Sequence, residues 1–155
     1  MNTLLNAPAA RPETAGEEIL IALLRRSETL AAVPVVPDQA AAGHPQCVVY
    51  ELLEERRRRL LSGLHTGHVW RKFALYVKHP SRGASRVLAD AVRAALHAQG
   101  GRDADLNKIV VAGKWLKQSW VVDGERDESL PGVDGSREPD RYRTLEAILI
   151  YEEEN

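Results

Sequence analysis

The chain has 155 residues, a formal net charge of −1 at pH 7 and a single cysteine. The length favours one domain, the charge argues against a freely acting nucleic-acid binder, and one cysteine excludes an internal disulfide and a paired-cysteine metal site.

Several features indicate a protein that is made and used in a cytoplasm. No apolar run approaches the roughly 18 residues of a membrane-spanning helix, so no membrane association is expected. The first residues lack the basic start and apolar core of a signal peptide. The lone cysteine, Cys47, suits a reducing compartment.

The N-terminal part is expected to contain an arm, a helix and an extended segment. Residues 1–14 have no periodicity and are predicted to be a mobile arm before a single domain over 15–155. A helix is expected from near Thr14, and its apolar pattern fades by Ala32. Residues 33–37 are expected to be extended, because residues before proline avoid the helical conformation.

The next segment is ambiguous. Residues 46–50 are expected to form an apolar strand. Residues 51–64 have good helix propensity, yet they can equally form the far arm of a long hairpin that returns through Ser62 and Gly63 into a strand at Val69. The hairpin is the preferred interpretation, and the helix remains an alternative.

Residues 69–96 are predicted to form a strand followed directly by a helix. Phe73, Leu75 and Val77 alternate with polar or aromatic residues, which is typical of a strand with one dry face. After Pro80 the period becomes helical, with an apolar stripe formed by Val87, Leu88, Ala91, Val92, Ala95 and Leu96.

The last third is expected to hold strands and one long loop. Strands are predicted over 108–111, 114–123 and 141–151, and a polar loop over 123–140. The order of elements predicts an α+β fold. It would be a mostly antiparallel sheet of about four to five strands with two helices packed on one face.

Two charged segments are candidate subunit or partner interfaces. The first combines an arginine run with leucines that the hairpin would place at its tip, where little of the domain covers them: Arg56, Arg57, Arg58, Arg59, Leu60, Leu61 and Leu64. The second is acidic: Asp123, Glu125, Asp127, Glu128 and Asp134. The two segments could pair between subunits. The arginine run could also be a solvated face balanced by nearby glutamates, or a contact to DNA phosphates.

Three tryptophans are further candidates for interface residues. Trp115 and Trp120 are expected on opposite faces of their strand, so one should lie in the core. The other, with Trp70, would either anchor an interface or be covered by the stems of lysine and arginine side chains.

No catalytic, cofactor or metal site is expected. His65 and His68 are three positions apart, but nothing places a third ligand near them. The acidic loop lacks the spacing of a calcium-binding loop, and no nucleophile or phosphate-binding motif is present. The protein is therefore not expected to be an enzyme.

The layout of elements resembles that of the small tail-completion proteins of long-tailed bacteriophages, which include tail terminators and tail-to-head joining proteins. The resemblance rests on the order of elements and is not a chemical signature. It extends over residues 15–152, and its most family-like piece is the Leu-Ala-Asp-Ala-Val-Arg-Ala-Ala-Leu helix. The matching pieces are residues 17–24, 46–50, 70–78, 88–96 and 143–151.

The resemblance implies a structural virion protein, assembled in the host cytoplasm, that forms a homo-oligomeric ring, taken as a hexamer. Such a ring ends growth of the tail tube and joins the tail to the neck. The implied partners are further copies of the chain, the tail tube protein, the neck or connector protein, and DNA that passes through the lumen without sequence-specific binding. Two alternatives stay open: a small α+β protein-binding module of a cellular complex, and a nucleic-acid binder that uses the arginine run.

Overall fold

The computed structural model describes residues 15–37, 44–59, 61–63, 65–130 and 140–153, with the backbone alone for 65–66, 123–130 and 140–142. The predicted arm, residues 1–14, lies outside this range. No helix in the described part is long and apolar enough to cross a membrane. The elements are α1 (Ala15–Arg25), β1 (Val35–Pro37), β2 (Cys47–Arg59), β3 (His65–Lys78), α2 (Arg82–Leu96), β4 (Val110–Val111), β5 (Lys114–Leu130) and β6 (Asp140–Glu152).

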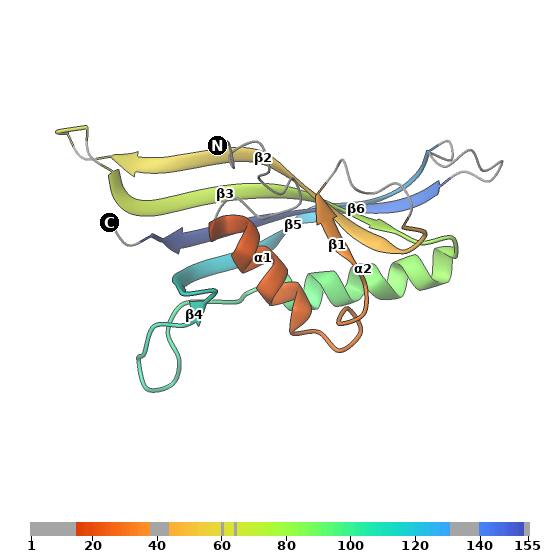
Figure 1. Ribbon diagram of the computed structural model, residues 1–155, viewed down its shortest axis with the longest axis horizontal. Helices are drawn as coiled ribbons and strands as arrows, with labels where there is room; N and C mark the ends of the chain where they lie inside the picture. The colour runs from red at the N-terminus through yellow and green to blue at the C-terminus, as the bar shows by residue number, and fades with distance from the viewer. Residues whose placement is uncertain (1–14, 38–43, 60, 64, 131–139, 154–155) are drawn as a thin grey trace, which may run out of the picture.

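The strands form one sheet in the order β1-β2-β3-β6-β5-β4, and α1 and α2 lie on the same side of it (Figure 1). The α+β fold is therefore confirmed. The predicted sheet of about four to five mostly antiparallel strands is corrected to a mixed sheet of six strands. The difference arises because β1 pairs with β2 in parallel. A three-residue strand that contains proline carries too little pattern to reveal its partner.

The core lies between the helices and one face of the sheet. Phe73 and Leu75 of β3 are fully buried on this face, as the alternation predicts. In α2 the buried residues are Ser85, Leu88, Ala89, Val92 and Leu96. Val87 is 58% exposed, so its predicted place on the apolar stripe is wrong. The helix turns about 100° per residue, which takes Val87 past the edge of the stripe that Leu88 and Val92 define.

The hairpin interpretation of residues 51–64 is confirmed as far as the structure describes them. β2 pairs with β3 from Cys47 opposite Lys78 to Arg59 opposite His65. The helix propensity of the glutamates and arginines is overridden because β3 offers a complete partner for backbone hydrogen bonding.

The predicted loop 123–140 is corrected at both ends. β5 continues to Leu130 and pairs with β6, whose first residue is Asp140. Polar composition concealed this two-stranded extension, because aspartate, glutamate and glycine are poor strand formers and the pairing alone stabilises it. Residues 131–139, including Asp134, lie outside the described range.

Candidate assembly surfaces

The arginine run lies on the final part of β2, at one end of the sheet. Arg56 Nε donates to Glu54 Oε1 at 2.8 Å, and the Arg56 guanidinium lies 4.8 Å from the centroid of the Trp70 ring. Arg56 therefore covers part of an aromatic ring on the sheet face that points away from the helices.

Arg57 points to the opposite face and belongs to a partly buried ion-pair cluster. It donates to Glu55, and its Nη1 lies 2.7 Å from Glu153 Oε2. The hydrogen bond from Arg57 holds the pKa of the Glu153 carboxyl below its ordinary value. Arg57 thus ties β2 to the residue that follows β6, so at least part of the arginine run has a structural role.

The same cluster continues inward to a buried arginine, Arg71 of β3, which the sequence analysis missed. Arg71 shares its face with Phe73 and is only 2% exposed. Its Nη2 lies 3.0 Å from Glu55 Oε2. A Cβ atom at Gly16 of α1 would lie 2.6 Å from Arg71 Cδ, so a glycine at this position makes room for the arginine. The sequence did contain a signal for this burial. Arg71 is two positions before Phe73, so the alternation places it on the face of the strand that is expected to be buried.

The tip of the β2–β3 hairpin is exposed. Arg58 and Arg59 are exposed on β2, and Leu61 is fully exposed beyond it. Leu60 and Leu64 lie outside the described residues. For Leu61, the expected exposed apolar side chain at the tip is confirmed.

The acidic segment lies at the other end of the sheet. Asp127 and Glu128 occupy register positions opposite Arg143 and Tyr142 of β6. Asp123 and Glu125 belong to the same strand. Arg57, in contrast, pairs with Val69, which is aligned with Tyr151 at the far end of β6. The two charged segments therefore lie at opposite ends of the molecule, as Figure 1 shows for β2 and β5, and do not meet within one copy.

Both long outer strands have edges that no described strand covers. β1 pairs with β2 only through residue Tyr50, so the part from Glu51 to Arg59 has an open side. β4 pairs with β5 only at Lys114 and Trp115. Further along β5, Gln99 bridges Ser119, and the backbone N–H of Val121 reaches His97 Nδ1 at 3.4 Å. Beyond this point β5 has no other described strand on the side away from β6.

Trp115 and Trp120 share one face of the sheet, so their predicted opposite placement is wrong. Their register partners on β6, Glu152 and Ile148, are an even number of positions apart. A bulge at Lys117 shifts the alternation by one residue. The Trp115 ring is covered by three cationic side chains, whose charged ends lie 4.7 to 4.9 Å from its centroid: Arg102, Lys108 and Lys117.

The positive charge at this end of the sheet also affects His68. Its pKa is lowered from the ordinary value of 6.5, first by partial burial and then by Lys117 and Arg58. Within the described ranges, no three histidine, cysteine, aspartate or glutamate side chains are grouped as metal ligands.

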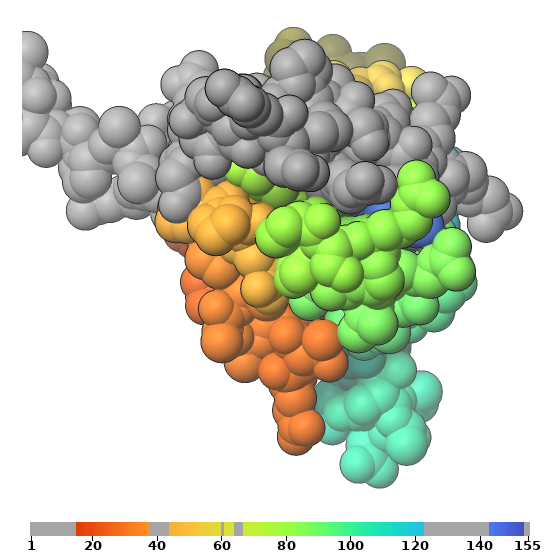
Figure 2. All heavy atoms as spheres, turned by 90° about the vertical axis from the view of Figure 1, so that its right-hand side faces the viewer, coloured from red at the N-terminus to blue at the C-terminus, as the bar shows by residue number. Residues whose placement is uncertain are grey.

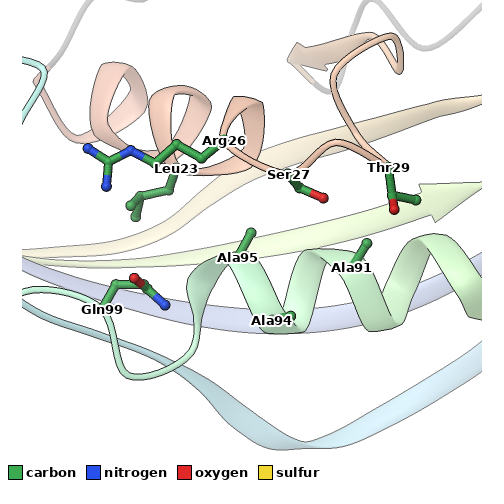
Figure 3. Close-up of a pocket in the computed structure, with 8 residues that line it drawn as sticks. All are labelled: Leu23, Arg26, Ser27, Thr29, Ala91, Ala94, Ala95 and Gln99. Atoms are coloured by element: carbon green, nitrogen blue, oxygen red, sulfur yellow. The ribbon is translucent and has the colours of Figure 1, made fainter.

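A groove of about 420 Å³ separates the end of α1 from the last turns of α2 (Figure 3). Its apolar part is formed by Leu23 and by small residues of α2, and its rim is polar. The full lining consists of Leu23, Arg26, Ser27, Thr29, Ala91, Ala94, Ala95 and Gln99. The lining combines apolar and polar side chains, so the groove suits the binding of a small group that has both characters.

Comparisons with known proteins give little further information. No family model matches the sequence. No curated protein matches it. Among solved structures, it is similar to a chain of one described as "Virion of native gene transfer agent (GTA) particle", with 17% sequence identity and a TM-score of 0.49 over 90% of this chain and 99% of that chain. A likeness at this level establishes neither a shared fold nor a shared function.

Proposed function

We propose that the chain is a structural, non-enzymatic tail-completion protein of a phage-like particle. Many copies would form a ring at the head-proximal end of the tail tube, where the ring ends tube growth and joins the tail to the neck. The assignment to a phage-like particle is based on the resemblance in the order of elements. The observation that carries the ring is the pair of open sheet edges at opposite ends of one subunit.

Two different edges of one chain favour a head-to-tail contact between copies. Such a contact is heterologous, and it closes into a ring when the rotation between copies fits. An open edge presents unpaired N–H and C=O groups that another strand can bind. From β2 through β3 and β6 to β5 every neighbouring pair is antiparallel. Copies related by rotation about an axis inclined to the strands would therefore also join β5 to the next β2 in antiparallel fashion. The inclination brings the open part of β5 beside the open part of β2, although the two lie at opposite ends of one subunit.

Charge supports the same pairing. The open part of β2 ends in the exposed Arg58 and Arg59, whereas the far part of β5 has the acidic sequence positions Asp123, Glu125, Asp127 and Glu128. Opposite charges on two edges steer them together and disfavour the contact of like edges. In this proposal the two candidate segments are the two halves of one repeated interface.

The proposed ring has two different faces, because all copies point the same way. One face would cap the tail tube protein and the other would dock the neck or connector protein. DNA would pass through the lumen without sequence-specific contacts, in keeping with a net charge of −1. The arginine run supports the nucleic-acid alternative less well, because Arg56 and Arg57 hold Glu54, Glu55 and Glu153 within the chain.

A charge exchange tests the edge contact. The double variant Arg58→Glu/Arg59→Glu should lose assembly, and so should Asp127→Lys/Glu128→Lys, because each brings like charges together. A chain with all four changes should assemble again. Sedimentation velocity measures the size of each species. The control Arg86→Glu alters an exposed residue of α2 and should leave assembly unchanged.

The fourfold variant gives the decisive result of this experiment. If the fourfold variant assembles as the unmodified chain does, the two edges meet between copies. If each double variant assembles normally, or if the fourfold variant stays dissociated while circular dichroism shows it folded, the proposed interface is wrong.

A further inference from the structure

The loop between α2 and β4 has a defined internal structure. Asp103 Oδ1 accepts hydrogen bonds from the backbone N–H groups of Asp105 and Asn107, both at 2.9 Å. Arg102 Nη1 donates to the carbonyl oxygen of Leu106 at 2.9 Å. At its base, the backbone N–H of Ile109 donates to Gly101 O at 3.0 Å. The loop is therefore a braced projection, and it extends beyond the helix layer in both Figure 1 and Figure 2.

The tip of this loop exposes an apolar side chain in an unfavourable backbone conformation. Leu106 has φ of +65°, a region that glycine or asparagine adopts more readily than leucine. The same side chain is 73% exposed, and Val110 nearby on β4 is 55% exposed. Neither the core nor the local turn explains a leucine here, because a polar residue would suit both water and the backbone better.

A complementary surface exists on the same chain. The groove between α1 and α2 has an apolar part made by Leu23, Ala94 and Ala95, and the exposed Arg26 stands on its rim (Figure 3). The loop tip bears the exposed carboxylate of Asp105 next to Leu106. The loop tip thus has an apolar side chain beside a negative charge, and the groove has an apolar part beside a positive charge, so the two surfaces are complementary.

We propose that the loop tip of one copy binds in the α1–α2 groove of the next copy, with Leu106 in the apolar part and Asp105 facing Arg26. The tip and the groove are different patches of one chain, so the contact is head-to-tail, like the edge contact. This inference rests on the proposed ring and adds a second contact to it. It also accounts for the strained leucine, since the side chain becomes buried only after assembly.

Crosslinking between two singly substituted chains tests this contact. Leu106→Cys with an affinity tag is mixed with untagged Ala94→Cys and oxidised mildly with copper phenanthroline. A disulfide that joins tagged to untagged chain can form only between copies, and only when the Cβ atoms approach within roughly 4.5 Å. The matched control replaces Ala94→Cys by Val87→Cys, an exposed position on α2 outside the groove.

The expected result is a tagged–untagged dimer with Ala94→Cys at least about tenfold more abundant than with Val87→Cys, because assembly raises the effective concentration only of thiols that it brings together. Equal yields, or dimers formed only between two tagged chains, would overturn the contact. If the unmodified chain forms a ring by native mass spectrometry but the groove crosslink is absent, the loop contact fails and the ring survives. If neither is seen, both proposals fail.

A second variant guards against loss of folding. Leu106→Asn keeps the left-handed backbone conformation, which asparagine tolerates, and removes only the apolar group. It should leave the midpoint of thermal unfolding of the dissociated chain unchanged or higher, and should weaken self-association by about tenfold or more. Unchanged self-association would contradict the proposal.

Discussion

Arg71 Nη2 lies 3.0 Å from Glu55 Oε2 in the layer between the sheet and α1, at a place where the strand alternation would allow an apolar side chain. A buried charge is costly unless it is paired, so this ion pair constrains both strands. Arg57 extends the cluster to Glu153, so partly buried ion pairs connect β2, β3 and the end of β6 where the arginine run lies.

Removing Glu55 should therefore destabilise the protein. We expect Glu55→Ala to lower the free energy of unfolding by about 2 kcal/mol, below the full cost for a buried pair because the Glu55 side chain is 30% exposed. Urea denaturation measures the change. The control Glu54→Ala removes the exposed pair with Arg56 and should cost less than about 1 kcal/mol. Equal losses for the two variants would contradict the structural role of Arg71.

Gly100 should tolerate no side chain. It has φ of +93°, and a Cβ atom would lie 2.7 Å from the carbonyl oxygen of Leu116. We expect Gly100→Ala to cost about 3 kcal/mol, of which backbone strain contributes roughly a third. Gly113 also has a positive φ, of +79°, but open space around it, so Gly113→Ala should cost about 1 kcal/mol. Similar costs, compared by thermal unfolding, would show that the close approach of Gly100 to β5 is wrong.

The stability of the protein should fall as His68 is titrated. Its pKa in the folded protein lies below the ordinary value of 6.5, so on acidification the unfolded chain binds the proton first. The free energy of unfolding should thus decrease as the pH falls through 6.5 towards the pKa in the folded state. His68→Gln should lose less stability than the unmodified chain over this window, measured by urea denaturation at several pH values. Parallel pH profiles would contradict the prediction.

Cys47 should be inert in the folded protein. Its side chain is 0% exposed, and its thiol lies 3.9 Å from the carbonyl oxygen of His44. We expect a water-soluble thiol reagent to react at least about a thousandfold more slowly than in urea, because reaction requires unfolding. The added thiol of Leu106→Cys, at an exposed loop tip, provides the fast reference. Rapid labelling of native Cys47 would contradict its burial.

The sequence predicted the elements with strong periodicity. The alternation of Phe73, Leu75 and Val77 identified β3 and its buried face, and the spacing of Leu88, Val92 and Leu96 identified α2. These patterns are informative because each side chain's burial follows from its own position. Deviations of one residue were not predictable: the bulge at Lys117 places Trp115 and Trp120 on one face, and no local signal in the sequence marks it.

The candidate site was predicted only in part. The sequence identified the arginine run and the exposed Leu61, but it could not distinguish Arg57, which is paired inside the chain, from its neighbours, because the partner Glu153 is 96 positions away. It also assigned the segment from Asp123 to a loop, since pairing with β6 and not local propensity makes it a strand. The strained Leu106 carried no recognisable pattern at all.

Native mass spectrometry of the purified chain over a range of concentrations, with negative-stain images of the same samples, tests the central claim most directly. The account predicts a closed ring, taken as a hexamer, that dissociates when Arg58 and Arg59 are replaced by glutamate. A monomer at every concentration, or a symmetric dimer that stays intact in this variant, would contradict head-to-tail assembly through the two sheet edges.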